Sequence, residues 1–306
     1  MGSFVLGRTT NALITVILIL VFVFVGARIG GDPISVMFPD GIDAETQAAI
    51  EAQLGLDQPI PVQFVYYVRD LLQGDFGNSI HSRRPVLEMY ADRLPATLTL
   101  AALAFALSVV MGIGLGLIGA LRRDHASGRF AMTLAFLGYS IPHFVLAILL
   151  IFLFGYVLRL LPTVGNATPY HFILPAFVLA AGLTAAIARY TRSVLLDVLS
   201  EDYVRTARSK GLRDRMVNLK HALPNAMIPV VTVLGLQLTG LVSGSLIVEE
   251  VFAFRGVGQL LVGSVREADY PVLQCGVIFF GIAVVLINLG VDILCAVLDP
   301  RIRVGG

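Results

Sequence analysis

The sequence predicts an all-α integral membrane protein with six transmembrane helices. The chain has 306 residues, of which 57% are hydrophobic and 14% charged, and its mean hydropathy is +0.83. A water-soluble domain carries about 25% charged residues. So much apolar side chain cannot be enclosed in one core of this length, so a lipid bilayer is its natural solvent. The net charge of +1, without any basic tract interleaved with aromatic residues, argues against nucleic acid as a partner.

Six uncharged stretches are long enough to cross about 30 Å of hydrocarbon, which takes roughly 20 helical residues. They are 9–27, 94–121, 130–158, 172–188, 226–248 and 270–291. The second and third exceed the required length and are expected to tilt or to extend past the bilayer. The first resembles a secretory signal because Arg8 precedes it, but its apolar part is too long for a signal core. We interpret it as a retained helix.

The distribution of basic residues predicts the orientation. With the N-terminus inside, the inside segments hold fourteen of the 22 basic residues, eight of them within 189–220. The short outside loops hold only Arg159, Arg255 and Arg266. Because cytoplasmic loops carry the excess of Lys and Arg, both termini are predicted to be cytoplasmic.

The long loop after the first span is expected to form a small folded external region. Asp43 can cap a short helix over 44–54, residues 62–73 are a second helix candidate, and Gly-Asp-Phe-Gly at 74–77 is typical of a turn. The predicted organisation has three parts: an N-terminus with the first transmembrane helix (1–27), a periplasmic loop region (28–93) and a five-helix core (94–306) with a cytoplasmic loop over 189–225.

The cytoplasmic loop carries the strongest local signals. Ser200 is a good N-cap residue followed by two acids, Arg208 and Lys210 stand at the negative end of the helix dipole, and Gly211 suits a left-handed C-terminal position. These signals agree on one short helix that ends at the glycine.

A second short helix should follow, with one apolar face. Leu212, Met216, Leu219 and Leu223 recur at intervals of four, three and four, and Pro224 is expected to end the helix. Two helices that are basic outside and apolar underneath could dock on a cytoplasmic partner. The same pattern equally fits an amphipathic helix lying on anionic lipid.

This loop resembles the signature of the permeases of binding-protein-dependent ABC importers. That signature reads Glu-Ala-Ala, three residues, Gly, nine residues, then Ile-x-Leu-Pro. Aligned on the glycine, the chain offers Arg205, Thr206, Ala207 and Gly211, then His221, Ala222, Leu223 and Pro224. The Ala, Gly, Leu and Pro positions match, whereas Arg205 and His221 depart from the general form.

The resemblance narrows to the dipeptide, oligopeptide, glutathione and nickel branch of these permeases. Tyr-Val-Arg-Thr-Ala-Arg-Ser-Lys-Gly at 203–211 is similar to the version of the signature found in that branch. Further similar segments are Gly-Asp-Pro at 31–33, Leu-Gly-Leu-Asp-Gln-Pro at 54–59, Gly-Asp-Phe-Gly-Asn-Ser at 74–79, Asp-Tyr-Pro-Val at 269–272 and Leu-Asp-Pro-Arg-Ile-Arg at 298–303.

The resemblance implies a type I ABC importer permease fold in a bacterial inner membrane. It implies four partners besides membrane lipid: a second homologous permease, two cytoplasmic ABC ATPase subunits, and a periplasmic or lipid-anchored substrate-binding protein. ATP and Mg belong to the partners, and no cofactor is expected in this chain. The implied ATPase-coupling residues are Tyr203, Arg205, Thr206, Ala207, Lys210, Gly211, Leu223 and Pro224.

Catalytic and metal motifs are missing from the sequence. Its two lysines, Lys210 and Lys220, follow Ser and Leu, so no Walker A motif can be written. The five histidines are dispersed, without a His-x-x-x-His pair. The chain is therefore expected to be a transport subunit and not an enzyme.

Polar residues within the spans are candidates for the transport path. Ser140, His143, Gln237 and Ser243 could line it, although hydrogen bonds between helices explain them about as well. Asp292 is expected to serve as a structural partner near the interface; a proton carrier is the other interpretation.

The glycine pairs and one pair of glutamates each have a structural interpretation and a functional one. The glycine pairs at 112/116 and 240/244 allow helices to pack closely. Glu249 and Glu250, at the outer end of the fifth span, are expected to be solvated, or else to face a docked binding protein.

The preferred function is an ATP-driven importer of di- or oligopeptides, with glutathione or nickel as alternative cargo. A proton-coupled secondary carrier would depend on Asp292 and should show inverted repeats, which the sequence does not have. A membrane-embedded hydrolase would need clustered acids, histidines or a nucleophile, and the spans offer too few.

Overall fold

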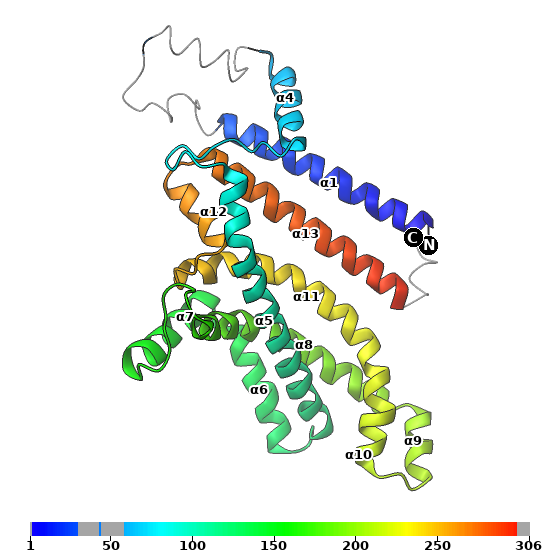
Figure 1. Cartoon of the computed structure of the whole chain (residues 1–306). Helices are drawn as coiled ribbons and strands as arrows, with labels where there is room; N and C mark the ends of the chain where they lie inside the picture. The colour runs from blue at the N-terminus through cyan, green and yellow to red at the C-terminus, as the bar shows by residue number, and fades with distance from the viewer. Residues whose placement is uncertain (1, 30–42, 44–57, 299–306) are drawn as a thin grey trace. The chain divides into compact units, whose positions relative to one another are not determined.

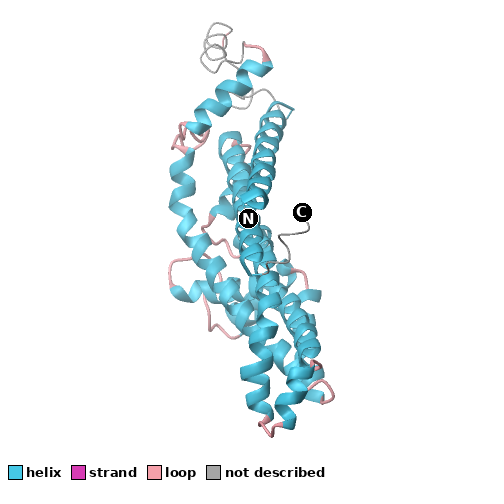
Figure 2. Ribbon diagram, turned by 90° about the vertical axis from the view of Figure 1, so that its right-hand side faces the viewer, coloured by secondary structure: helices cyan, strands magenta, loops and turns pink. Residues whose placement is uncertain are grey.

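The computed structural model describes residues 2–29, 43 and 58–298, and over these the regular elements are all helical (Figures 1 and 2). The helix predicted over 44–54 and the family-like segment at 31–33 lie outside the described residues, as do residues 54–57 of the segment at 54–59 and 299–303 of the segment at 298–303. Five helical stretches are long and apolar enough to cross a membrane: Val5–Gly26, Val86–Leu121, Pro169–Leu199, Asp214–Val251 and Tyr270–Ala296. A bent pair, Ala126–Ser140 with His143–Val157, makes a sixth if it counts as one span. The predicted all-α class is confirmed.

The chain divides into two compact units. The first contains Leu98–Phe254 with Met1–Val5 and Ile287–Gly306, and the second contains Leu6–Thr97 with Arg255–Leu286. Helices α5 (Val86–Leu121) and α13 (Tyr270–Leu298) contribute residues to both.

The second unit contains α1 (Gly2–Ile29), α4 (Ile60–Leu72), α12 (Val257–Arg266) and the first parts of α5 and α13. Helix α4 and the positive φ angles of Gly74 (+80°) and Gly77 (+76°) confirm the helix and the turn predicted over 62–77. The core of this unit consists of Val86, Tyr90, Val257, Leu260, Val272 and Cys275.

A buried polar pair holds the turn of the second unit to the start of α13. Ser79 Oγ donates a hydrogen bond to Asp269 Oδ2 at 2.6 Å, and the backbone N–H of Ile80 donates to Oδ1 at 3.3 Å. Ser79 and Asp269 are 2% and 3% exposed. The hydrogen bond thus joins the segments at 74–79 and 269–272, which were identified separately in the sequence.

In the first unit, α8 (Ile173–Leu199) packs against α6 (Ala126–Ser140) and α11 (Leu223–Val251). Thirteen buried residues lie along α8. Gly112 and Gly116 on α5 face α8 so closely that an added Cβ would lie 2.6 Å from Ile187 Cβ and from the Ala188 carbonyl oxygen, respectively. This pair therefore makes the close packing expected of it.

The span predicted over 130–158 is a bent pair of helices and not one straight helix. Helices α6 and α7 (His143–Leu150) meet at an angle of 102°, and a π-helical turn, Ile151–Val157, follows α7. Ile141 is extended (φ −91°, ψ 121°) because a residue before proline is disfavoured in the α region, and Pro142 is extended as well. The expectation that Glu249 is solvated was wrong, since its side chain is fully buried near the end of α11.

Candidate functional site

The predicted cytoplasmic loop begins with α9 (Asp202–Ser209). Its N-cap is Glu201, so the assignment of that role to Ser200 was wrong. Ser200 instead ends α8 with helical backbone angles, and its Oγ donates to the Asp197 carbonyl oxygen at 2.6 Å. Because the preceding spanning helix α8 extends to Leu199, Ser200 is the C-cap of α8 and cannot begin α9.

Gly211 ends α9 as predicted, in the left-handed region with φ +76°. Its N–H donates to the Arg208 carbonyl oxygen at 2.9 Å, and Lys210 is the C-cap residue. A Cβ added at Gly211 would meet no atom within 4 Å. Backbone conformation, and not lack of space, therefore favours glycine here.

The second helix of the loop does not end at Pro224, which corrects the prediction. Helix α10 (Asp214–Met216) continues through a π-helical segment, η3 (Val217–Ala222), into α11. Proline lacks the N–H of a regular turn and clashes with the carbonyl four residues earlier. The wider π turn just before Pro224 offers a place for the ring without breaking the rod.

The apolar residues that the loop buries differ from those predicted. Both helices anchor in a core cluster of Ala120, Leu195, Val204, Ala207, Val217, Ala222 and Ala226. Leu212, Met216 and Leu219, expected underneath, are 36%, 47% and 43% exposed. Leu212 precedes α10 and Met216 is its last residue, so only Leu219 lies in the π segment, where the rotation per residue differs from that of an α-helix.

Polar contacts brace the two halves of the loop against each other. Asn225 Nδ2 donates to Tyr203 Oη at 2.9 Å, and Arg208 Nε lies 3.5 Å from Asp214 Oδ1. Arg205 pairs with Asp202 at 3.4 Å within α9. Both ion pairs are largely exposed and add little stability, so the buried cluster supplies most of the anchoring.

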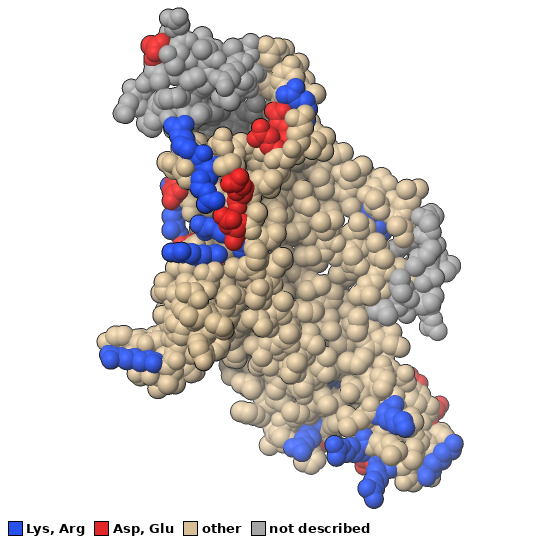
Figure 3. Space-filling model, in the orientation of Figure 1, with Lys and Arg blue, Asp and Glu red and all other residues tan. Residues whose placement is uncertain are grey.

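The structure brings the predicted coupling residues together in one loop. Exposed members of this set are Tyr203, Arg205, Thr206, Lys210, Gly211 and Pro224. Leu223 is half-buried, and Ala207 is buried in the cluster, where it anchors α9. Lys and Arg side chains gather at the end of the first unit that carries α9 and α10 (Figure 3). Sequence reasoning missed the outward apolar stripe of Leu212, Met216 and Leu219.

The candidate path residues lie on separate helices. Ser140 and His143 flank the break between α6 and α7; Ser140 is exposed, with its Oγ donating to the Phe136 carbonyl, and His143 packs against Gly182 of α8. Gln237 is half-buried and Ser243 exposed on α11. Over residues 2–29, 43 and 58–298, no hydrogen bond joins any two of these four.

The described part of the chain offers no set of three or more His, Cys, Asp or Glu side chains that could hold a metal ion. Cys275 is buried and Cys295 half-buried, and both are free thiols.

Two family models match this chain. Residues 112–304 match the family described as "Binding-protein-dependent transport system inner membrane component", and residues 1–101 match the N-terminal domain of such membrane components. The chain is 46% identical over 304 residues to a glutathione transport system permease protein, GsiC, of Salmonella typhimurium, covering 99% of each. It is 45% identical to the GsiC protein of Escherichia coli strain K12, again over 304 residues and 99% of each.

Solved structures support the fold. An inward-facing form of the MetNI methionine ABC transporter superposes with a TM-score of 0.59 at 19% identity, covering 69% of this chain and 96% of that one. The resemblance drawn from the loop signature is thereby confirmed. The chain belongs to the family of inner-membrane components of binding-protein-dependent transport systems.

Proposed function

We propose that this permease forms half of the translocation path of an ATP-driven importer, beside a second homologous permease. Two ATPase subunits bind ATP and Mg on the cytoplasmic side, and a binding protein delivers cargo from outside. Both termini and the loop over 189–225 face the cytoplasm, residues 28–93 face outward, and 94–306 form the five-helix core. The basic loop surface supports this orientation.

The observation that carries the proposal is the exposed apolar stripe of Leu212, Met216 and Leu219. Its helices are anchored from behind by the buried cluster, so they present the stripe on a supported surface. An amphipathic helix with such anchors suits an apolar groove on a protein partner. In this chain that partner is an ATPase subunit, and ATP-driven movement of the groove moves the loop.

The docking test compares two double variants of the same turn. Met216→Ala/Leu219→Ala should release the ATPase subunits from an affinity-tagged permease, because it removes the apolar anchors. Arg215→Ala/Lys220→Ala, on neighbouring exposed positions, should retain them. Equal retention in both variants would show that the stripe lies on lipid and not on the ATPase.

We further propose that the cargo is a small peptide, with glutathione as the first candidate. Support comes from relatives named as glutathione permeases that match 99% of this chain. In proteoliposomes containing the complete importer and its binding protein, glutathione should stimulate ATP hydrolysis more than dipeptides or longer peptides do. Stimulation by dipeptides alone would keep the importer but replace the cargo.

A further inference from the structure

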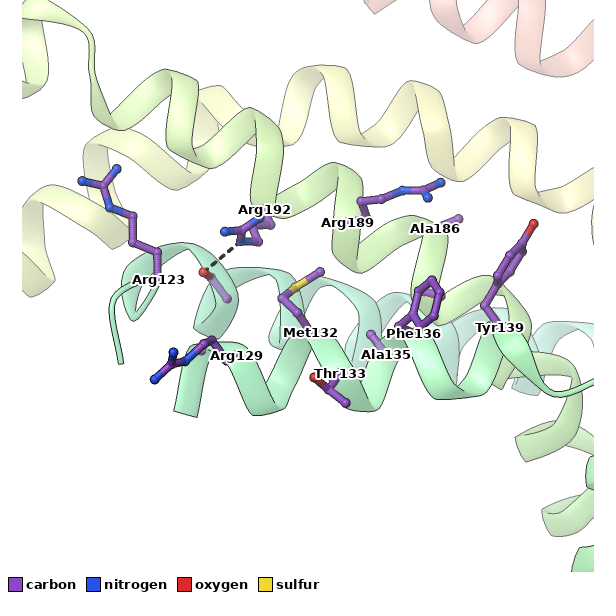
Figure 4. A pocket seen from close by; sticks show the side chains of 13 residues that line it. Arg123, Arg129, Met132, Thr133, Ala135, Phe136, Tyr139, Ala186, Arg189 and Arg192 are labelled. Atoms are coloured by element: carbon purple, nitrogen blue, oxygen red, sulfur yellow. Dashed lines mark hydrogen bonds between the residues drawn. The ribbon is translucent and has the colours of Figure 1, made fainter. Parts of the chain in front are cut away.

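Besides the loop surface, the first unit carries an arginine-lined cavity and a polar pair between two helices. In the cavity, of about 560 Å³, the side chains of Arg129 and Arg189 point away from each other (Figure 4), so they do not converge on one ligand. The polar pair consists of Thr239 on α11 and Asn288 on α13. Both residues lie inside stretches that are long and apolar enough to cross a membrane.

The pair is held by a close contact between α11 and α13. Thr239 Oγ1 donates a hydrogen bond to Asn288 Oδ1 at 2.9 Å. About one turn away, a Cβ added at Gly235 would lie 2.8 Å from Val291 Cγ1, so the two helices approach each other closely there. The helix packing thus fixes the position of the Asn288 amide.

The amide of Asn288 is only partly satisfied. Its side chain is exposed, and over the described residues the hydrogen bond with Thr239 is the one that it makes. Because a hydroxyl satisfies only one end of an amide, the other end stays open in either orientation of the group. An unsatisfied amide is strongly disfavoured in hydrocarbon. Asn288 therefore indicates a polar environment at this depth.

Helix α13 exposes a separate apolar face. Leu286, Gly290 and Leu294 recur every four residues, and all three are exposed. At about 100° per residue, Gly290 lies roughly 160° around the helix from Asn288. The apolar face suits lipid, so the amide on the opposite side points elsewhere.

We propose that Thr239 and Asn288 line the water-filled path, and that the Asn288 amide hydrogen-bonds the cargo. Ser243, a path candidate, is exposed four positions after Thr239 and extends the same face of α11. Amide N–H groups donate to carbonyl and carboxylate oxygens, which every peptide carries. The inference rests on the proposed importer function and assigns residues to its path.

The test is cysteine labelling of the complete importer in proteoliposomes, in a background with Cys275→Ser and Cys295→Ser. A charged methanethiosulfonate reagent, present on both sides of the bilayer, should modify Asn288→Cys and Thr239→Cys rapidly. Gly290→Cys is the matched control, because Gly290 is exposed two positions away and a Cβ there would meet no atom within 4 Å. It should react roughly a hundredfold more slowly, since a charged group is disfavoured in hydrocarbon by about that factor. Equal rates at 288 and 290, or slow labelling at both 239 and 288, would overturn the proposal.

Uptake of radiolabelled glutathione and, separately, of dialanine tests the hydrogen bond to cargo. Asn288→Leu should lower uptake roughly fivefold, the factor that corresponds to one lost hydrogen bond. Asn288→Gln keeps the amide and should retain more uptake at an equal amount of permease in the membrane. Equal uptake by the two variants would remove the contact with cargo. If wild type imports neither peptide, the proposed cargo fails, whereas the labelling rates still decide whether the pair lines a water-filled path.

Discussion

Single hydrogen bonds join distant parts of the chain in the second unit. Ser79 and Asp269 are 190 positions apart, and Tyr90 Oη donates to the Val272 carbonyl oxygen at 2.9 Å. All of these side chains are buried, so a lost partner leaves a polar group without water to replace it. These few atoms fix the turn at 74–79 on the start of α13.

Replacing Asp269 by Ala should destabilise the second unit by about 1–3 kcal/mol, because the Ser79 hydroxyl and the Ile80 N–H lose their acceptor. The measurement is the midpoint of thermal unfolding of the detergent-solubilised importer. Asp269→Asn keeps a carbonyl acceptor and should recover part of the loss. An Ala variant as stable as wild type would mean that the pair contributes nothing.

Gly211 is expected to respond to backbone chemistry and not to size. Gly211→Asn should retain most transport, since Asn tolerates the left-handed region, while Gly211→Val should uncouple ATP hydrolysis from uptake through backbone strain. The strain costs roughly 1–2 kcal/mol at this one residue. Gly211→Asp also tolerates this conformation, and it should uncouple because it adds a negative charge to the docking surface. Insertion into the membrane should be normal in all three variants, as judged by the amount of permease in washed membranes. Normal uptake in the Val and Asp variants would remove the loop from the coupling mechanism.

The structural roles of residues could be predicted where they depend on contacts with near neighbours in the sequence. The left-handed position of Gly211 and the turn at 74–77 follow from a few neighbouring residues. Ser200 was assigned wrongly because its role depends on how far α8 extends, which local capping signals do not encode. The Ser79–Asp269 pair could not be predicted at all, since only the tertiary fold brings the two together.

At the scale of elements, α5 and α8 pack closely because small residues occupy the contact. At Gly116 an added Cβ would lie 2.6 Å from the Ala188 carbonyl oxygen and 2.7 Å from Thr191 Cβ. A Cβ added at Gly114, two positions earlier on the same helix, would have no atom within 4 Å. The two positions therefore offer a matched comparison.

Gly116→Ala should destabilise the first unit by about 1–3 kcal/mol, because the methyl group overpacks the contact with α8. Gly114→Ala should be neutral or stabilise by about 0.5–1 kcal/mol, because it removes helix flexibility without a clash. Thermal unfolding of the two variants in parallel distinguishes them. Equal effects would show that α5 and α8 do not pack in this way in the membrane.

The lengths of the apolar stretches predicted the positions of the long helices well. They did not predict where a helix bends. Five stretches coincide with long helices, whereas the third is broken at Pro142. The opposite error occurred at Pro224, where the rod continues. Prolines also lie inside continuous helices at Pro95 and Pro229, so a proline alone does not mark a helix end, and the π segment at Val217–Ala222 was not visible in the hydrophobic pattern.

At the scale of the whole molecule, composition alone established the solvent of this protein. Many apolar side chains remain exposed, such as Leu13 at 61% and Phe22 at 73% on α1, as a lipid environment permits. The family followed from one loop signature and several short segments. The cargo could not be predicted, because selection by a separate binding protein leaves little trace in the permease sequence.

The proposed topology predicts which side of the membrane each loop faces. In a background with Cys275→Ser and Cys295→Ser, a cysteine at Arg215 should react with an impermeant maleimide only after the cells are opened. A cysteine at Asp75 should react in intact cells, because the proposed topology has residues 28–93 outside. Labelling of Arg215→Cys from outside would invert the orientation and with it the side on which the ATPases dock.

The uninterrupted rod from Asp214 to Val251 has a mechanical consequence. Its 38 residues measure roughly 57 Å at 1.5 Å per residue. One end belongs to the cytoplasmic loop, and the other lies close to Glu249. A tilt of about 5° displaces the far end by about 5 Å over that length. A movement of the loop can therefore be transmitted to the far end by the rigidity of the helix itself, pivoting where α11 packs on α8. Pro229, inside the helix, is the position where it bends most easily.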